Sequence, residues 1–106
     1  AVTTAQITYA ARNSDFDGFA INEGDYLALL DGKLFGTERD ITSLLTRLAA
    51  LAAEREAAFV TLFYGEGVSQ EEAEAAQDLF TKACPETEVS LLSGGQPVYY
   101  YTISIE

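Results

Sequence analysis

The stretch AFVTLFYGEGVSQEEAEAAQDLFTKACPETEVSLL (residues 58–92) decides the fold of this chain. It opens on an almost continuously apolar run ending at Tyr64, which predicts a central strand covered on both faces. Ser69 followed three residues later by Glu72 is a capping-box pattern, which predicts the start of an amphipathic helix. A second strand begins near Val89. The stretch therefore predicts a β-α-β unit, whose two strands are parallel because such crossovers are right-handed.

The residues before this unit predict a strand, a hairpin and a helix. Residues near the N-terminus alternate in a way that predicts a strand, whose buried face carries Ile7, Tyr9 and Ala11. The stretch 13–18 has the composition of a loop. Asp31-Gly32 lies between two apolar runs, 26–30 and 33–35, and such a pair favours a two-residue hairpin turn. From Asp40, a plausible N-cap, apolar residues recur three and four apart, which predicts a helix ending near Arg55.

The last strand follows a chain reversal at Gly94 to Pro97. Alternation from Val98 to the chain end predicts a core face that carries Tyr99, Tyr101, Ile103 and Ile105. Tyr100 then points to the opposite face, away from the helices, where a phenol suits a protein contact. A second buried layer or a scattered surface aromatic would account for Tyr100 and Tyr64 equally well.

These elements predict one fold class. We expect an α/β two-layer sandwich: a mixed sheet of about five to seven strands, two helices, one β-α-β unit and an N-terminal β-hairpin region. Residues 1–106 are expected to form a single domain.

Composition and charge exclude several classes of function. The chain has 106 residues, 48% of them hydrophobic, and a formal net charge of −11, from 17 acidic and six basic side chains. That charge repels phosphate backbones and anionic lipid surfaces, so we expect neither nucleic acid nor membrane as a partner. The sequence has no Met, which predicts a processed chain or a part of a longer protein. It has no His and a single Cys84, so histidine-dependent nucleophiles and a structural zinc site are excluded within one copy.

Acidic residues near the N-terminus suggest two kinds of site, and for both a solvated acidic turn is the plainer interpretation. The run 13–18 matches the first half of an EF-hand calcium loop, but the twelfth position is Gly24, where the loop needs Glu. Paired-carboxylate chemistry is the other possibility. The candidates for it are Asp15, Asp17, Glu23, Asp25 and Asp31.

Two glycine loops form the more informative candidate. If the strands of the β-α-β unit are parallel neighbours, the loops that follow them leave the sheet at the same edge, where α/β proteins usually bind ligands. A phosphate ligand is disfavoured, since Glu66, Glu71 and Glu72 lie near the start of the second helix. Tight turns alone would also explain the glycines. The candidate contact residues are Gly65, Glu66, Gly94, Gly95, Gln96, Pro97 and Tyr100.

Three runs carry a resemblance to a known family. They are ITYAARNSDFDGFAINEGDYLALLDGKL (7–34), TLFYGEGVSQEEAEAAQDLF (61–80) and SLLSGGQPVYYYTISIE (90–106). In order and spacing they resemble the C-terminal domain of the bacterial fatty-acid kinase ATP-binding subunit, described as dihydroxyacetone-kinase-like. The family usually has Pro where Tyr100 stands, and Pro marks an edge strand or a bulge.

The resemblance implies a function for this domain within a cytoplasmic kinase. An N-terminal domain would bind ATP and magnesium, and this domain would bind a separate fatty-acid-binding subunit, so that the assembly makes acyl phosphate for phospholipid synthesis. No catalytic residue, metal or cofactor is expected in these 106 residues. The alternative is a regulatory module that senses a small ligand or a metal.

Overall fold

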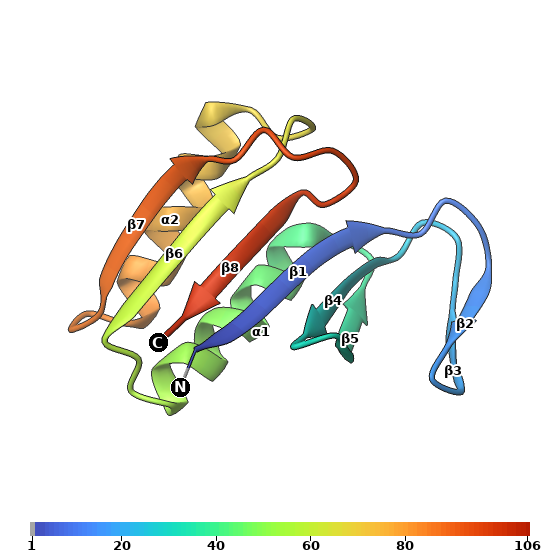
Figure 1. Ribbon diagram of the computed structural model, residues 1–106, viewed down its shortest axis with the longest axis horizontal. Coiled ribbons are helices and arrows are strands. Elements are labelled where there is room, and N and C mark those ends of the chain that lie inside the picture. Colours follow the sequence, from blue (N-terminus) through green and yellow to red (C-terminus); the bar gives the residue numbers. More distant parts are fainter. Residues whose placement is uncertain (1) are drawn as a thin grey trace.

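The computed structural model describes residues 2–106, which form a sheet with helices on one face and a small separate hairpin (Figure 1). The helices are α1 (Ile41–Glu54) and α2 (Gln70–Ala83). The strands are β1 (Thr3–Tyr9), β2 (Ser14–Phe16), β3 (Phe19–Ile21), β4 (Tyr26–Leu30), β5 (Lys33–Glu38), β6 (Phe59–Tyr64), β7 (Glu88–Ser93) and β8 (Tyr101–Ile105).

The main sheet confirms the predicted mixed two-layer sandwich. Its order is β5-β4-β1-β8-β6-β7, and only β6 and β7 pair in parallel, as the β-α-β unit predicts. The prediction that β6 is a central strand covered on both faces is wrong. The last strand, β8, lies between β1 and β6, so β6 is next to the edge strand. Its outward face has no helix over it, and Phe59 there is 49% exposed.

Both predicted helices begin at the predicted caps. The Asp40 carboxylate accepts hydrogen bonds from the Ser43 N–H and hydroxyl, both at 2.8 Å, which hold the pKa of Asp40 below its ordinary value. Ser69 accepts from the Glu72 N–H and Glu72 accepts from the Ser69 N–H, each at 3.1 Å, so the capping box is complete. These bonds satisfy N–H groups that have no partner within a helix.

The core lies between the helices and one face of the sheet. Its largest fully buried side chains are Phe80, Ile7, Leu44, Leu48, Leu62, Ile103 and Val60. The predicted buried face of β1 is correct only for Ile7. Tyr9 is 44% exposed and β1 ends there, because the chain turns away at Ala10 toward the small hairpin.

The stretch 13–18, predicted to be a loop, is part of a second β-hairpin. Asp17 and Gly18 have φ of 50° and 82°, and they join β2 to β3 as Asp31 and Gly32 join β4 to β5. Asp-Gly is the same turn signal in both places, but strands of three residues are too short to show a period. Ile21 of this hairpin packs with Leu27 into a small second core.

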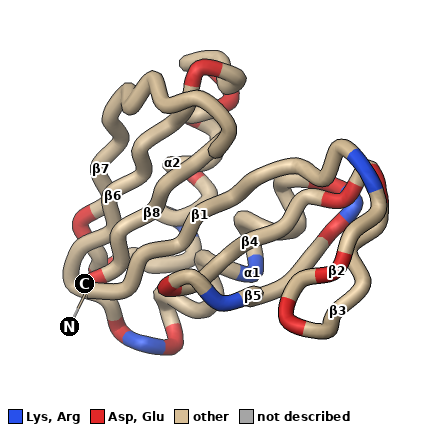
Figure 2. The backbone as a smooth tube through the Cα atoms, turned by 45° about the vertical axis from the view of Figure 1, so that its right-hand side comes forward, with Lys and Arg blue, Asp and Glu red and all other residues tan. Residues whose placement is uncertain are grey.

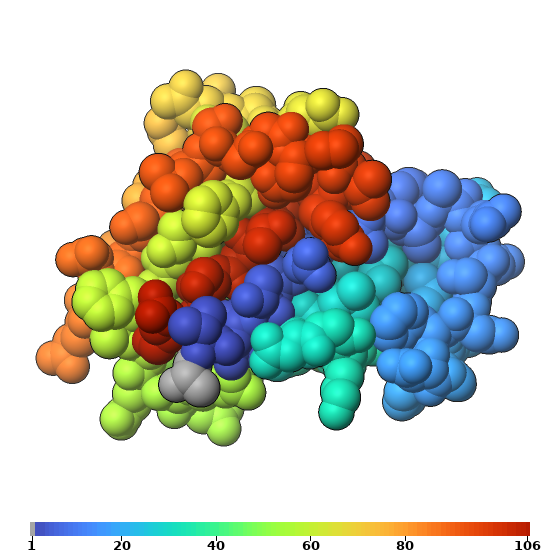
Figure 3. Space-filling model, viewed as in Figure 1, coloured from blue at the N-terminus to red at the C-terminus, as the bar shows by residue number. Residues whose placement is uncertain are grey.

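Charged residues are absent from three middle strands of the sheet. Strands β1, β8 and β6 carry no charged residue, whereas Asp and Glu gather on helices, turns and loops (Figure 2). Figure 3 views the uncovered face, with β7, β6, β8 and β1 side by side. Neither helix in residues 2–106 has the length and hydropathy needed to cross a membrane.

Candidate functional site

The two glycine loops lie side by side at one end of the sheet. The N–H groups of Gly94 and Gly95 donate to the Tyr64 carbonyl at 2.9 and 3.1 Å. In the other direction, the Glu66 N–H donates to the Gln96 carbonyl at 3.1 Å. The predicted meeting of the loops at the C-terminal ends of β6 and β7 is therefore present in the structure.

The glycines serve the turns themselves. Gly95 has φ of +64°, a region that residues with a Cβ adopt at a cost. Gly65 has no such φ, but a Cβ there would overlap the carbonyl oxygen of Tyr99 and lie 2.7 Å from that of Gln96. Glycine is thus required at position 65 because two backbone segments approach closely there. At position 95 glycine is favoured because the backbone has a positive φ.

The position of Tyr100 differs from the sequence prediction. Val98 has φ of 74°, and the Tyr99 N–H donates to the Pro97 carbonyl at 2.8 Å, so a tight turn interrupts the extended chain before β8 begins at Tyr101. The side chains of Tyr99, Tyr100 and Tyr101 therefore do not alternate between the two faces of the sheet. Tyr100 lies on the helix side and packs against the core, as does Tyr64, and neither is the fully exposed aromatic that the sequence allowed.

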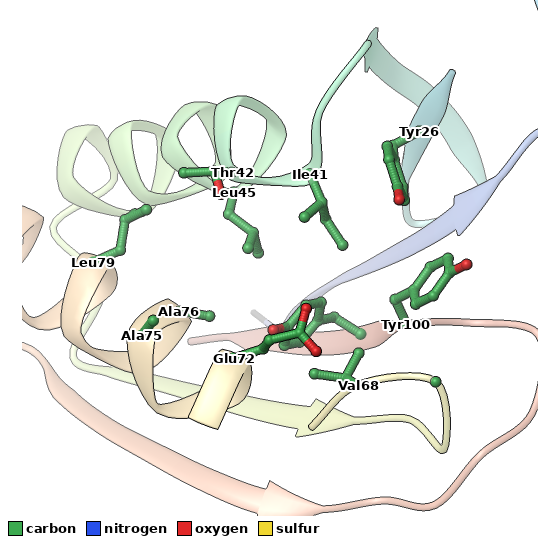
Figure 4. Close-up of a pocket in the computed structure, with 12 residues that line it drawn as sticks. Tyr26, Ile41, Thr42, Leu45, Val68, Glu72, Ala75, Ala76, Leu79 and Tyr100 are labelled. Atoms are coloured by element: carbon green, nitrogen blue, oxygen red, sulfur yellow. The ribbon is translucent and has the colours of Figure 1, made fainter. Parts of the chain in front are cut away.

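Tyr100 borders a cavity of about 380 Å³ between the beginnings of the two helices (Figure 4). Ile41 and Leu45 of α1 face it from one side, and Ala76 and Leu79 of α2 from another. The remaining lining residues are Tyr26, Thr42, Gly67, Val68, Glu72, Ala75, Tyr100 and Tyr101. Its size and mostly apolar wall are typical of binding pockets.

Three phenols, the Thr42 hydroxyl and the Glu72 carboxylate are the polar side-chain groups among the described residues that line the cavity. The Tyr26 and Tyr100 rings meet edge to face, with centroids 5.6 Å apart, and Tyr9 packs edge to face on Tyr26 at 5.2 Å. Burial, and secondarily the nearby Glu72 charge, raise the pKa of Tyr101 to about 12. Burial is also the main cause that raises the pKa of Tyr26. Neither Lys nor Arg is among the residues of the described part, 2–106, that line the cavity.

A shallow groove continues the cavity across the glycine loops. It is lined by Glu66, Gly67, Gln96, Val98, Tyr99 and Tyr100, and it shares Gly67 and Tyr100 with the cavity. Glu66 and Pro97 are exposed, and Val98 is 75% exposed. The Gln96 side chain is half-buried and donates to the Phe63 carbonyl at 3.1 Å, which fastens its loop to β6. The cavity and this groove together are called the loop-end surface below.

Sequence reasoning found the loops but missed most of the cavity. Tyr26, Ile41 and Leu79 come from β4, α1 and α2, and each fits an ordinary core position in its own element. No local pattern shows that their side chains surround a hollow. The exception is Glu72, which the capping box already placed at the second helix start.

Two of the acidic residues near the N-terminus, Asp25 and Asp31, have structural partners for their carboxylates. Asp31 accepts from the Thr4 N–H at 2.9 Å. Asp25 forms a salt bridge with Arg39 at 2.8 Å and accepts from the Asn22 N–H, and these contacts lower its pKa. Within residues 2–106 no cluster of three or more potential metal ligands occurs. The structure does not bring these carboxylates to the loop-end surface.

The fold and the motifs define the class of this chain. It belongs to the C-terminal family of FakA-like fatty acid kinase subunits, whose family model matches residues 1–106. It is 34% identical over 105 residues to the protein YloV of Bacillus subtilis, and 26% identical over 105 residues to an uncharacterized protein of Staphylococcus aureus. These matches cover 99% of this chain but 19% of each relative, so the chain spans about a fifth of their length.

Two solved structures share the fold. The Streptococcus pneumoniae fatty acid kinase (Fak) B3 protein, loaded with linoleic acid, aligns with a TM-score of 0.62 at 8% identity, over 99% of this chain and 44% of that one. A fatty acid binding DegV family protein from Streptococcus agalactiae aligns with a TM-score of 0.57 at 16% identity, over 98% of this chain and 44% of the other. At these identities the likeness concerns the fold alone.

Proposed function

We propose that this chain is a docking domain of a fatty-acid kinase, which binds the fatty-acid-binding subunit through the loop-end surface and carries no chemistry itself. Membership of the FakA-like family supports a role in a kinase system. Phosphoryl transfer, with its ATP and magnesium, is assigned in this proposal to another domain of the longer protein.

The observation that carries the proposal is the meeting of the two glycine loops beside a cavity. Hydrogen bonds hold the two loops together, since the Glu66 N–H donates to the Gln96 carbonyl and the N–H groups of Gly94 and Gly95 donate to the Tyr64 carbonyl. Preformed loops lose little conformational entropy when a partner binds. Exposed Val98 and half-buried Tyr100 offer apolar and aromatic contact area there.

The residue types of the cavity favour recognition over catalysis. The sequence has no His, and among the described residues that line the cavity Glu72 is the one carboxylate. Glycosidase-type catalysis uses a pair of carboxylates that flank the scissile bond. A single carboxylate among phenols is better suited to recognition.

Calorimetric titration of this chain with the fatty-acid-binding subunit of the same organism tests the proposal. Glu66→Arg reverses an exposed charge in the groove and should weaken binding about tenfold or more, because charges at an interface alter both encounter and fit. Glu86→Arg is the matched control, an exposed charge reversal in the turn before β7, at the opposite end of the strands. Its affinity should equal that of the unmodified chain.

Either of two results would count against docking at this surface. One is no detectable heat or complex at roughly 100 μM of both proteins, a concentration that reveals even weak association. The other is equal loss of affinity in both variants, which would mean that net charge rather than this surface governs the interaction.

A further inference from the structure

We propose that the cavity between α1 and α2 receives a cationic side chain, an arginine, from the docked protein. This inference rests on the proposed docking function and names the chemistry that the partner brings to the loop-end surface. The walls, the rim and the charge of the cavity support it.

The walls suit the apolar part of such a side chain. Ile41, Leu45 and Leu79 point into the hollow (Figure 4), and a volume of about 380 Å³ is ample for one long side chain. Arginine buries a three-carbon stem along apolar surface while its guanidinium seeks polar partners. An arginine inserted in a pocket is also a common source of binding energy at interfaces.

The rim suits the guanidinium. Tyr26 and Tyr100 present two rings in an edge-to-face pair, and a cation over an aromatic face is attracted by the negative potential of that face. Glu72 points into the same space (Figure 4). Its Oε1 accepts the Ser69 N–H at 3.1 Å, so the capping box fixes the carboxylate in place before any partner arrives.

Charge excludes the other classes of occupant. A fatty-acid carboxylate would face Glu72 with no Lys or Arg in the lining to compensate. A purely apolar side chain would displace water from the Glu72 carboxylate and leave it only the bond from the Ser69 N–H, which is costly for a charged group. Only a cation pairs with the carboxylate and the phenols together.

A pair of probes of equal shape and opposite charge tests the cavity itself. Benzamidine is a planar monocation and benzoate is its anionic counterpart. In 15N-HSQC titrations of the chain, benzamidine should shift the amides of Gly67, Val68 and Tyr100 saturably at millimolar concentration, and benzoate should not. Equal shifts from both probes, or none from benzamidine, would overturn the cation site.

Two glutamine variants of α2 separate charge from structure. Glu72→Gln removes the cavity charge but keeps the capping box, since Gln is also accepted at that position. Glu71→Gln removes an equal charge from the same exposed first turn, outside the cavity lining. We expect benzamidine affinity to fall at least about fivefold in the first variant and to stay unchanged in the second.

The same variants, titrated with the fatty-acid-binding subunit, test the assignment of the cation to that partner. Glu72→Gln should lose about tenfold or more in affinity, and Glu71→Gln should lose little. If the subunit binds all three forms equally, the cavity proposal is wrong while docking stands. If benzamidine binds and the subunit does not bind any form, docking fails and the source proposed for the cation fails with it.

Discussion

Gly65 illustrates how a single residue holds the loop-end surface together. Its N–H donates to the Tyr100 carbonyl at 2.8 Å, and its missing side chain lets the Gln96 and Tyr99 carbonyls approach closely. Gly95, in the facing loop, has open space around it and instead needs a positive φ. Two glycines within one site are thus required for different physical reasons.

Alanine substitutions at Gly65 and Gly95 should reduce stability by different amounts, because the two glycines are required for different reasons. Gly65→Ala places a methyl group against backbone atoms that cannot rotate away, and we expect a loss of about 1–3 kcal/mol in the free energy of unfolding. Gly95→Ala meets no neighbour and should lose about 1 kcal/mol through backbone strain alone. Urea unfolding of both variants measures this. Unchanged stability of Gly65→Ala would show that the loops do not approach so closely.

Tyr101 should make stability fall at alkaline pH. Its pKa is raised from the ordinary 10.0 to about 12, so the folded state favours the neutral phenol. The stability that this group contributes is complete below pH 10 and is lost as pH rises through 10 to 12. By linkage the loss reaches about 1.4 kcal/mol at pH 11.

Urea unfolding at several pH values between 9 and 11 measures how steeply the free energy of unfolding falls with pH. Tyr101→Phe has no phenol to ionise and should show a shallower decline over the same range. The pKa of Tyr26 is also raised, so Tyr26 accounts for the pH dependence of stability that remains in the Tyr101→Phe variant. A variant that declines as steeply as the unmodified chain would rule out Tyr101 as the source.

At the scale of elements, the sequence predicted the features that local patterns control. The caps at Asp40 and Ser69, the Asp31-Gly32 hairpin and the parallel β6 and β7 are all confirmed. Each depends on residues within a few positions of one another or on a general rule of chain handedness. The meeting of the two glycine loops followed from the same rule, because parallel neighbours end at one edge.

Features set by distant parts of the chain were not predicted. The insertion of β8 between β1 and β6 decides which strand is central, and nothing in the run 59–64 indicates it. The turn at Val98 is likewise followed by long-range bonds of Tyr100, whose N–H donates to the Ile7 carbonyl and whose carbonyl accepts from the Gly65 N–H. The turn breaks the alternation of faces expected across the three tyrosines. The cavity is the sum of such effects, since four separate elements and two loops surround it.

At the scale of the whole molecule, stability should be concentrated in the middle of the sheet. Strands β1 and β8 pair with neighbours on both sides, and their inward residues Ile7 and Ile103 are fully buried. The β2-β3 hairpin pairs only within itself and extends from one end of the sheet (Figure 1). Segments with few buried contacts open locally without unfolding the rest.

Native-state hydrogen exchange should show this gradient directly. We expect amides of β1 and β8 to exchange only on global unfolding, and those of β2 and β3 to exchange roughly a hundredfold faster or more, by local opening. Adding denaturant at low concentration supplies the control, because it accelerates exchange by global unfolding much more than exchange by local opening. Equal protection and equal denaturant dependence in the hairpin would mean that Ile21 and its small core bind the hairpin into the same cooperative unit as the sheet. The hairpin would then be a rigid part of the domain, and a partner that contacts it would meet a fixed surface.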